Sequence, residues 1–341
     1  MTETRVGVIG AGAGAAAATY VADGATDAEL TVFEKSRGVC GRAAARRRDG
    51  KVYEYGANYL KDEDDRVNEL VDRFDDGLVE VEGPIWTFDS DGNVSEGRGD
   101  DERRWTYDDG ITRLAKRLFG ATDATVERET RVTDVRRGDD GWCLVADGEE
   151  RGPFDALVVN PPAPQTAELL SDTGAEGVDR LGDAAADVPY RTVWTAVLGY
   201  GFEVDAPYYA LINTDDGHDI GWLAREECKP GHVPDGESVL IVQASPDWSE
   251  RRYDAPADDN VAELARKTAA VVGDERLAEP DWTDHQGWRY ALPDTGVRRG
   301  AVQDAADENV YATGDWVAGE ARLHAAVRNG LETGESLAYR L

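Results

Sequence analysis

Apolar and polar positions follow one another along the chain in runs that predict both strands and helices. The chain opens with an apolar strand at residues 5–9, a glycine-rich turn, an alanine-rich helix up to about residue 22, and a second strand at 30–33. Short apolar runs bounded by turn residues are typical of buried strands. The order strand, helix, strand predicts an α/β fold.

The middle of the chain carries a different pattern, in which apolar and polar residues alternate with a period of two. Such alternation predicts strands with one buried face. The aromatic-rich strands among them, followed by an amphipathic helix, predict a mostly antiparallel sheet. The predicted elements are a hairpin at residues 131–147, a strand at 156–159, aromatic-rich strands at 191–200, 208–212, 220–224 and 238–244, and an amphipathic helix at 260–272.

The glycine-rich turn has the spacing of a phosphate-binding fingerprint. Gly10 permits a tight turn, Gly12 lets the backbone approach a pyrophosphate, and Ala15 lets the helix pack closely on the sheet. The helix then presents free N–H groups and the positive end of its dipole to the phosphates. The residues predicted to bind a dinucleotide here are Gly10, Ala11, Gly12, Gly14 and Ala15.

Glu34 closes the second strand, where a carboxylate can accept a hydrogen bond from a ribose hydroxyl. A carboxylate at this place favours a cofactor with a free 2′-hydroxyl, which means FAD or NAD rather than NADP. An alanine- and glycine-rich stretch can also be a low-complexity helix start. The position of this stretch between two strands, with Glu34 beyond it, favours the dinucleotide site.

Three further segments resemble the flavin amine oxidase superfamily. Residues 35–42 resemble its GG-R loop, and residues 55–59 resemble its turn beside the flavin ring. Near the end of the chain, residues 309–315 resemble its ATG-D segment, which runs into a long helix at 322–339. The resemblance implies FAD as cofactor. We expect FAD to be held non-covalently, because no cysteine lies in 309–341.

The resemblance also implies roles for individual residues. Arg42 would lie near the pyrophosphate, where its planar fork suits phosphate oxygens. Cys40 stands where the superfamily has glycine, so a change of loop backbone is expected there. The helix start at His324, often a Glu in the superfamily, would stabilise negative charge on the flavin ring. The residues implied at the cofactor are Lys35, Gly41, Arg42, Gly56, Ala57, Asn58, Tyr59, Val132, Gly314, Asp315, Leu323 and His324.

Four segments of the chain resemble the renalase branch of that superfamily. The branch implies an oxidase that transfers hydride from the 2- and 6-dihydro isomers of NAD(P) to flavin N5, with O2 as acceptor and H2O2 as product. A dihydropyridine leaves as a stable cation and needs no catalytic base. The four histidines accordingly form no triad or metal-ligand spacing. The four segments are residues 221–225, 229–231, 243–249 and 288–293.

Other functions remain open from the sequence. One is another enzyme of the superfamily, acting on an amine or a polyene, and another is an FAD-binding protein without catalysis. Trp288 and Tyr290 are candidate walls of the substrate pocket, with core packing as the alternative. Trp248 is expected to be a packing residue. Lys229 is expected in a loop, and the alternative is a lysine that holds a water near flavin N5.

The segments that carry these motifs predict two domains. A discontinuous Rossmann-type FAD-binding domain is expected from residues 1–73, 125–172 and 282–341. A substrate domain built on a mostly antiparallel sheet plus helices is expected from residues 74–124 and 173–281. A chain of 341 residues, 41% of them apolar, is long enough to build two hydrophobic cores.

The net charge of −32, with 69 Asp and Glu against 37 Lys and Arg, changes what partners are expected. Such a charge repels nucleic acids and anionic lipids. In about 1 M salt the Debye length falls to about 3 Å, so this self-repulsion is largely screened. We therefore expect a halophilic source. The alternative is an acidic surface made for a basic partner.

The remaining composition points to a cytoplasmic protein with a small-molecule substrate. The longest apolar run, residues 9–22, is short for a membrane span of about 20 residues. The first strand begins at Arg5, so no secretory signal is expected ahead of it. Three widely separated cysteines form neither a disulfide framework nor a zinc site, and no metal is expected. The sequence leaves the oligomeric state open.

Overall fold

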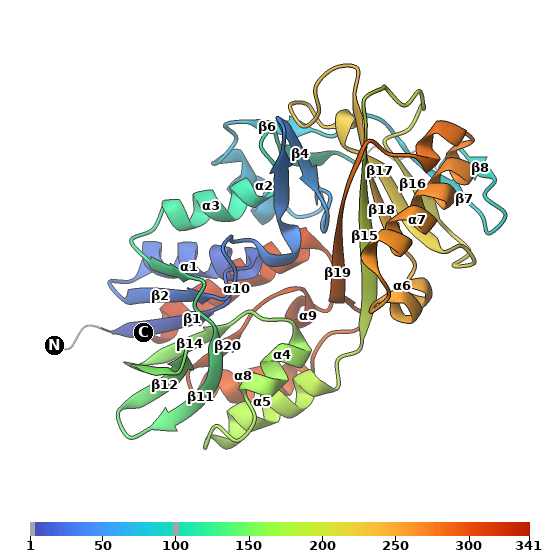
Figure 1. Cartoon of the computed structure of the whole chain (residues 1–341). Helices are drawn as coiled ribbons and strands as arrows, with labels where there is room; N and C mark the ends of the chain where they lie inside the picture. The colour runs from blue at the N-terminus through green and yellow to red at the C-terminus, as the bar shows by residue number, and fades with distance from the viewer. Residues whose placement is uncertain (1–3, 98–101) are drawn as a thin grey trace.

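The computed structural model describes residues 4–97 and 102–341 and contains two main sheets, each covered by helices (Figure 1). The first is a five-stranded sheet in the order β10-β2-β1-β14-β20, and every neighbouring pair in it is parallel. The predicted Rossmann-type α/β fold is confirmed. Its strands are β1 (Arg5–Ile9), β2 (Glu29–Glu34), β10 (Thr125–Arg128), β14 (Ala156–Val159) and β20 (Val310–Ala312).

Helices cover both faces of the parallel sheet because successive strand residues point to opposite faces. Val6 and Val8 of β1 lie in one core cluster, whereas Ile9 lies in the other. The helices that contribute side chains to the first cluster include α1 (Ala13–Ala25), α3 (Thr112–Gly120) and α10 (Leu323–Arg340). Those that contribute to the second include α4 (Ala163–Leu169), α5 (Glu176–Ala186) and α8 (Arg299–Asp307).

Small residues allow α1 and α10 to pack with their backbones almost in contact. A Cβ added at Gly330 would lie 2.2 Å from the carbonyl oxygen of Gly14, and one added at Gly334 would lie 2.6 Å from that of Ala18. All the alanines of α1 except Ala25 are buried, and Ala17 and Ala18 lie directly at this contact. The small residues of α1, which make its sequence resemble a low-complexity stretch, are therefore what the close approach of α10 requires.

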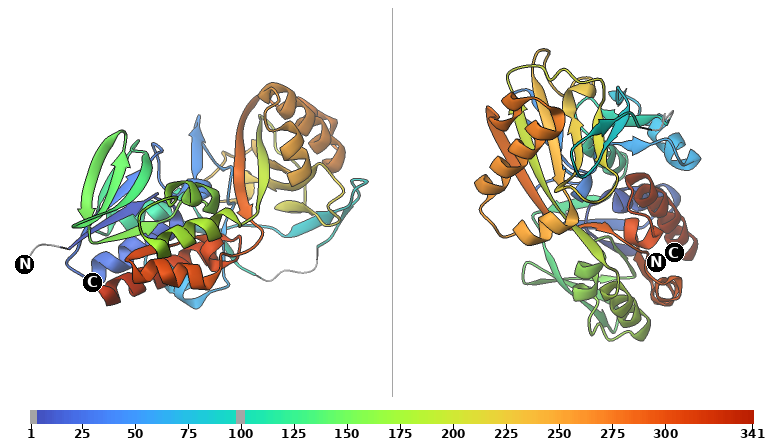
Figure 2. Two further views of the ribbon diagram at one scale, coloured as in Figure 1. Left: turned by 90° about the horizontal axis from the view of Figure 1, so that it is seen from below. Right: turned by 90° about the vertical axis from the view of Figure 1, so that its right-hand side faces the viewer.

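The second main sheet has seven strands in the order β19-β15-β18-β17-β16-β7-β8 (Figure 2). All of its neighbouring pairs are antiparallel except β16 with β7, as predicted for a mostly antiparallel sheet. The helices α6 (Pro246–Arg252) and α7 (Ala257–Val272) pack on its outer face. Its strands are β7 (Ile85–Phe88), β8 (Val94–Ser95), β15 (Tyr190–Tyr200), β16 (Ala210–Asn213), β17 (Ile220–Arg225), β18 (Ser238–Ala244) and β19 (Trp282–Pro293).

The predicted strand at 208–212 begins two residues later than expected, at Ala210. The N–H of Tyr209 donates to the carbonyl of Pro84, one residue ahead of the ladder between β16 and β7. The predicted hairpin at 131–147 is present as β11 (Val132–Gly138) and β12 (Gly141–Ala146). A third strand, β13 (Glu149–Phe154), extends it and was not predicted.

Three smaller elements connect the two sheets. The hairpin of β3 (Ala45–Arg48) and β4 (Lys51–Glu54) leads to the 55–59 turn. A three-stranded sheet has the order β5-β9-β6. The helix α2 (Asp65–Asp72) follows β5 and contacts α10. The strands of the small sheet are β5 (Leu60–Lys61), β6 (Leu78–Glu80) and β9 (Arg104–Tyr107).

Three elements pack against the sheet of the other predicted domain, and the domain boundaries themselves stay a prediction. α3, inside the predicted substrate segment 74–124, packs against α1, and α5, inside 173–281, packs in the core of the parallel sheet. Conversely β19, inside the predicted cofactor segment 282–341, pairs with β15 in the seven-stranded sheet. Each of these elements packs on the sheet that buries its apolar residues.

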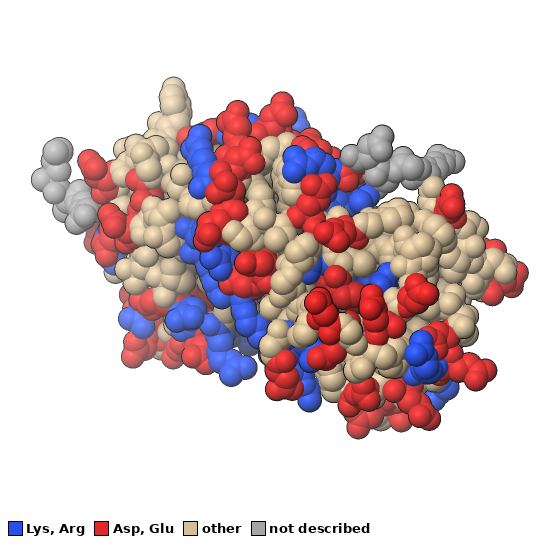
Figure 3. Space-filling model, turned by 90° about the horizontal axis from the view of Figure 1, so that it is seen from above, with Lys and Arg blue, Asp and Glu red and all other residues tan. Residues whose placement is uncertain are grey.

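Charge dominates the surface of the molecule. Figure 3 shows acidic side chains spread over the whole face seen from above, with basic ones between them. Within residues 4–97 and 102–341, no helix combines the length and the apolar character needed to cross a membrane.

The contact between α1 and α10 predicts the effect of a single added methyl group. Gly330→Ala should lower the free energy of unfolding by about 1–3 kcal/mol, because its Cβ would overlap the Gly14 carbonyl and force the helices apart. Gly24→Ala, in α1 with no atom within 4 Å of its added Cβ, is the matched control and should be neutral or stabilising by up to about 1 kcal/mol. Denaturant unfolding of both variants measures the difference. Equal stabilities would contradict the close packing.

The acidic surface predicts that salt stabilises the fold. Raising KCl from about 0.1 M to about 1 M shortens the Debye length from about 10 Å to about 3 Å, which screens the repulsion that a net charge of −32 creates. The midpoint of thermal unfolding should rise by about 3 °C or more, as expected for about 2 kcal/mol in a chain of 341 residues. Calorimetry at a series of salt concentrations checks this. A midpoint that stays constant or falls would show that self-repulsion does not limit stability.

Candidate cofactor and substrate site

The glycine-rich turn lies where β1 ends and α1 begins. Gly10 has φ of 88°, a conformation that favours glycine. Gly12 is the N-cap of α1 and offers no side-chain cap, so the N–H groups of the first turn remain for a ligand. A Cβ added at Gly12 would lie 2.3 Å from Asn160 Oδ1. Gly14 faces α10, since its added Cβ would lie 3.1 Å from the carbonyl oxygen of Ala326.

Asn160 is a residue of this site that the sequence analysis did not single out. It follows β14 directly, and its Nδ2 donates to the carbonyl of Thr313 at 2.8 Å. Its side chain lies against Gly12 and Gly314, which come from the two ends of the chain. The signal that could have identified it is its position, because ligands of open α/β sheets bind beyond the carboxyl ends of the strands.

Glu34 lies at the end of β2, beside the glycine-rich turn. Its Oε2 accepts a hydrogen bond from the N–H of Ala11 at 2.8 Å, and its Oε1 accepts one from Ser36 at 2.7 Å. Each carboxylate oxygen can accept a further hydrogen bond. The structure therefore holds Glu34 at the predicted place with acceptor capacity left for a ribose hydroxyl.

Cys40 brings the next loop against the glycine-rich turn. Its N–H donates to the carbonyl of Ala11 at 2.7 Å, and its φ is 80°, the region that favours glycine. The chain therefore adopts a glycine-like conformation here and holds a cysteine in it, which is strained for a side chain. Burial raises the pKa of the Cys40 thiol to about 12, so it remains a neutral packing residue.

Arg42 and Asp315 join the two ends of the chain. Arg42 Nη2 lies 2.8 Å from Asp315 Oδ1 and Nη1 lies 2.8 Å from Oδ2, a bidentate pair. Nη1 also donates to the carbonyl of Ala291, in β19, at 2.7 Å. Burial alone lowers the pKa of Arg42, but the charge and hydrogen bonds of Asp315 outweigh it and raise the pKa. The predicted pyrophosphate and ribityl residues thus lie side by side.

Side chains of the seven-stranded sheet anchor the 55–59 turn. Trp288 Nε1 donates to the carbonyl of Tyr55 at 3.0 Å, and its ring stacks on that of Tyr55 at 5.5 Å. Gln243 Nε2 donates to the carbonyl of Gly56 at 2.8 Å. A Cβ added at Gly56 would lie 2.0 Å from the carbonyl oxygen of Arg42, so only glycine fits. Gln243 was part of a motif but was not predicted as a site residue.

The two candidate pocket residues, Trp288 and Tyr290, lie in β19 where its register with β15 shifts, so their contacts rather than their spacing show where they lie. Trp288 contacts Tyr55 of the 55–59 turn, whereas Tyr290 packs edge-on against Tyr190, with ring centroids 5.8 Å apart. Trp248, by contrast, is buried on the outer face of the sheet, where its ring packs against Trp194. Trp248 is therefore a packing residue as expected.

Three aromatic rings meet beside the turn. The ring of Tyr59 lies 6.2 Å from that of Tyr209 and 6.3 Å from that of Trp222. Buried polar atoms at the same place have no hydrogen-bond partner in the described structure, namely Asn58 Oδ1, Tyr209 Oη and Trp222 Nε1. Together with the uncapped start of α1, they fit a bound flavin and substrate, which would supply partners to such atoms.

The start of α10 also lacks a side-chain cap. His324 is 3% exposed there, and its Nε2 lies 3.1 Å from Glu63 Oε2 and 3.3 Å from Glu320 Oε1. These three residues could in principle hold a metal ion. However, Lys61 Nζ lies 2.8 Å from Glu63 and Arg328 Nη2 lies 3.7 Å from Glu320, so the carboxylates already have cationic partners.

Lys35 and Val132 are two further residues that were predicted at the cofactor. Lys35 Nζ donates to Gln165 Oε1 at 2.9 Å, and Val132 is buried at the start of β11. Lys229 lies in a turn, as expected, but its side chain is completely buried, which the sequence analysis did not predict. Its Nζ is bound by two buried carboxylates, those of Glu54 and Glu226.

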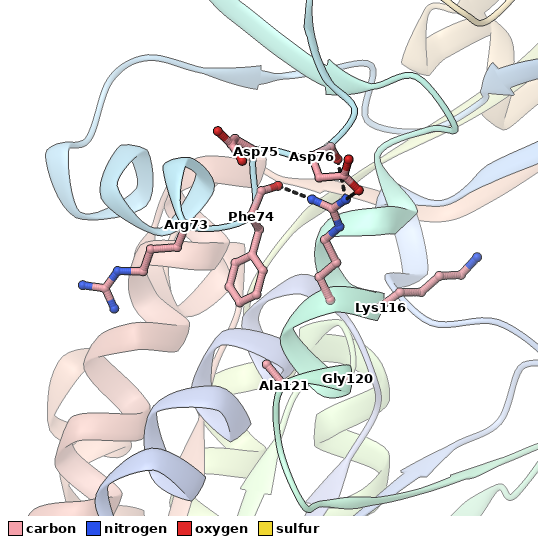
Figure 4. Close-up of a pocket in the computed structure, with 8 residues that line it drawn as sticks. Arg73, Phe74, Asp75, Asp76, Lys116, Gly120 and Ala121 are labelled. Carbon is pink, nitrogen blue, oxygen red and sulfur yellow. Dashed lines mark hydrogen bonds and ion pairs between the residues drawn. The ribbon is translucent and has the colours of Figure 1, made fainter.

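A surface hollow beside α2 and α3 lies away from all of these residues. Figure 4 shows Phe74 and Asp76 at this hollow, and the side chain of Arg117 donates hydrogen bonds to the carbonyl of Phe74 and to the carboxylate of Asp76. None of the predicted site residues lines it. It is lined by Arg73, Phe74, Asp75, Asp76, Lys116, Arg117, Gly120 and Ala121.

Comparison with known protein families agrees with this geometry. Residues 8–74 match the model of the NAD(P)-binding Rossmann-like domain, and residues 80–337 match that of the flavin containing amine oxidoreductases. The chain belongs to the flavin-containing amine oxidoreductase family. It is an FAD-dependent oxidoreductase, and the arrangement of its glycine-rich turn, Glu34 and the two uncapped helices fits that cofactor.

Solved structures show the same fold at low identity. A candidate protoporphyrinogen oxidase from Exiguobacterium sp. 255-15 is 14% identical with a TM-score of 0.82, and 100% of each chain is covered. Cyclohexylamine oxidase from Brevibacterium oxydans IH-35A is 13% identical with a TM-score of 0.76, covering 99% of each. A UDP-galactopyranose mutase is 11% identical with a TM-score of 0.76, covering 99% of this chain and 96% of that one. Because these proteins differ in reaction, the fold alone does not identify the substrate.

The pair of Arg42 and Asp315 predicts how a conservative change affects the cofactor. Arg42→Lys should weaken FAD binding about tenfold or more, because an ammonium group cannot reproduce the bidentate contact and leaves Asp315 incompletely paired. The matched control is Arg276→Lys, which alters a similar fork with Asp274 on the surface and should leave binding unchanged. Titration of the apoprotein with FAD, followed by flavin fluorescence, measures both. An unchanged dissociation constant in Arg42→Lys would remove Arg42 from the cofactor site.

Proposed function

We propose that this flavin-dependent oxidoreductase is a renalase-like oxidase. Its substrates would be the 2- and 6-dihydro isomers of NAD(P), with O2 as acceptor and H2O2 as product. Bound FAD supplies the hydride acceptor, and the chain supplies binding, orientation and exclusion of water. The observation that carries the proposal is the aromatic site at the 55–59 turn, where, among the described residues, no ring that contacts Tyr55 or Tyr59 belongs to a histidine.

The four histidines illustrate the absence of a base among the described residues of the turn. His218 packs edge-on against Phe88, and His285 stacks on Trp194 at 5.3 Å. His232 is bound between Glu226 and a backbone carbonyl, and His324 faces Glu63. A dihydropyridine can donate hydride without losing a proton to a base, so this arrangement suits it.

The aromatic side chains at the turn suit a flat ring. Tyr55 and Trp288 form a stacked pair whose planes differ by 11°, and the three rings of Tyr59, Tyr209 and Trp222 stand beside it. We propose that these side chains orient the substrate ring against the flavin and keep water away. Positioning of this kind can supply much of the rate when the chemistry itself needs no base.

An amine substrate is the second candidate. The family match and the fold shared with cyclohexylamine oxidase favour it. In that case the same aromatic side chains would bind a neutral amine. We also propose, from the net charge of −32, that the protein works in the salt-rich cytoplasm of a halophile, without nucleic acid or membrane as partners.

Reduction of the flavin without oxygen distinguishes these substrates. The 2- and 6-dihydro isomers of NAD(P) should bleach the flavin absorbance at about 450 nm rapidly, whereas ordinary NADH and simple amines should not. Air should then restore the absorbance and release H2O2. Bleaching by amines alone would favour the second candidate. A bound flavin that no tested compound reduces would indicate an FAD-binding protein without this catalysis.

A further inference from the structure

Four charged side chains lie together in the interior beside the 55–59 turn. Glu54, Glu226, Lys229 and His232 are each at most 1% exposed. Lys229 Nζ lies 2.7 Å from Glu54 Oε2 and 2.7 Å from Glu226 Oε1, and His232 Nδ1 lies 2.7 Å from Glu226 Oε2. We call these four residues the buried tetrad.

Both ring nitrogens of His232 face acceptors. Nδ1 faces the Glu226 carboxylate, and Nε2 lies 2.9 Å from the carbonyl oxygen of Tyr107. A carbonyl oxygen and an ionised carboxylate can only accept hydrogen bonds. Both ring nitrogens therefore carry hydrogen, and the ring is an imidazolium. The buried tetrad therefore holds two negative and two positive charges and is neutral as a whole.

Neutrality matters because these charges are removed from water. A buried charge is costly unless it is paired and hydrogen-bonded, and removal of one partner leaves the other uncompensated. The second oxygen of Glu54 accepts from the N–H of Ile111 at 2.6 Å and from the hydroxyl of Thr106. The hydrogen bonds of the buried tetrad thus reach β4, β9 and the segment 226–232.

The buried tetrad contacts the 55–59 turn by two routes. Glu54 is the residue immediately before Tyr55, so its position determines where the turn starts. At the other end, Lys229 Nζ lies 5.8 Å from the ring of Tyr209, and that ring lies 6.2 Å from the ring of Tyr59. Both the first and the last residue of the turn are therefore supported by the same four charges.

We propose that the buried tetrad positions the 55–59 turn for the flavin, and that Lys229 acts through this turn rather than by contact with the flavin. This inference rests on the proposed placement of the flavin beside the turn. Lys229 is then a positioning residue, and the neutrality of the buried tetrad is the property that matters for cofactor binding.

The charge of the buried tetrad changes with pH through His232. Burial alone lowers the pKa of this imidazole, but the hydrogen bond and charge of Glu226 outweigh burial, so the pKa lies above its ordinary value of about 6.5. The other charged groups facing it are Glu54, on β4, and Lys229, whose pKa is itself raised by the two carboxylates despite burial. His232 is therefore the member that loses its charge first as pH rises.

The sign of the pH effect follows from the raised pKa. The stabilisation by His232 is complete below about pH 6.5, its unfolded pKa, and is lost as pH rises through the higher folded pKa. Wild-type protein should therefore bind FAD more weakly at alkaline pH. Hydrogen–deuterium exchange of the peptide that contains residues 55–59 should become faster over the same pH range, in protein without FAD.

Two glutamine variants test whether neutrality is the cause. His232→Gln leaves the tetrad with one excess negative charge, so FAD binding at pH 7 should weaken about tenfold or more, with faster exchange in the turn. Glu226→Gln combined with His232→Gln leaves only the neutral pair of Glu54 and Lys229. The double variant should bind FAD within about threefold of wild type and lose the pH dependence.

Lys229→Met distinguishes positioning from contact with the flavin. Positioning predicts weaker FAD binding and faster exchange at residues 55–59. If Lys229 acted only near flavin N5, its replacement would instead slow flavin reduction. FAD affinity and exchange at residues 55–59 would then not change. Lys267→Met is the matched control, because Lys267 also pairs with two carboxylates, Asp219 and Glu263, but at the surface of α7. It should leave FAD binding and exchange as in wild type.

The outcomes separate this inference from the placement of the flavin. Wild-type affinity and exchange in His232→Gln, or a wild-type pH profile in the double variant, would overturn the role of the tetrad. If His232→Gln does not fold, the FAD affinity and pH profile of the double variant test the proposal alone. A double variant that does not fold would also contradict the proposal. A turn that responds to the tetrad while FAD affinity does not change would instead contradict the placement of the flavin beside residues 55–59.

Discussion

The close packing of α1 on α10 is the constraint on which the rest of the structure depends. The parallel sheet is assembled from three separated parts of the chain, and the cofactor residues come from both ends of it. Gly330 and Gly334 allow α10 to approach the backbone of α1. That approach places Gly314 against Asn160 and Asp315 against Arg42. Without this packing, the cofactor residues from the two ends of the chain would not lie together.

The sequence predicted most accurately those parts whose chemistry is local. A glycine-rich turn between two strands has few other uses, so Gly10, Gly12 and Glu34 are found at the places expected from their spacing. The ranges predicted for β15, β17 and β18 agree with the structure to within one residue, although β15 and β18 are buried on both faces rather than on one. The helices α3, α5 and α8 escaped prediction, because their apolar faces are recognisable only beside the sheet that buries them.

The residues that sequence reasoning missed act through distant partners. Asn160 and Gln243 have no motif of their own, and each matters because it reaches the backbone of another segment, Thr313 and Gly56 respectively. The buried tetrad shows the same limit. Nothing about Lys229 in sequence indicates burial, because its partner Glu54 lies far away in the chain, at the end of β4 in the hairpin of β3 and β4.

In a chain with a net charge of −32, salt affects exposed carboxylates and buried carboxylates differently. Repulsion between exposed carboxylates is screened within a few ångströms at high ionic strength, so the surroundings can relieve it. The charges of Glu54 and Glu226 lie where ions do not reach, and buried pairs are screened much less. Only protein groups can neutralise them, and Lys229 and His232 do so. Salt can therefore stabilise the surface of this protein, but the turn beside the proposed flavin position depends on charges that the chain itself must balance.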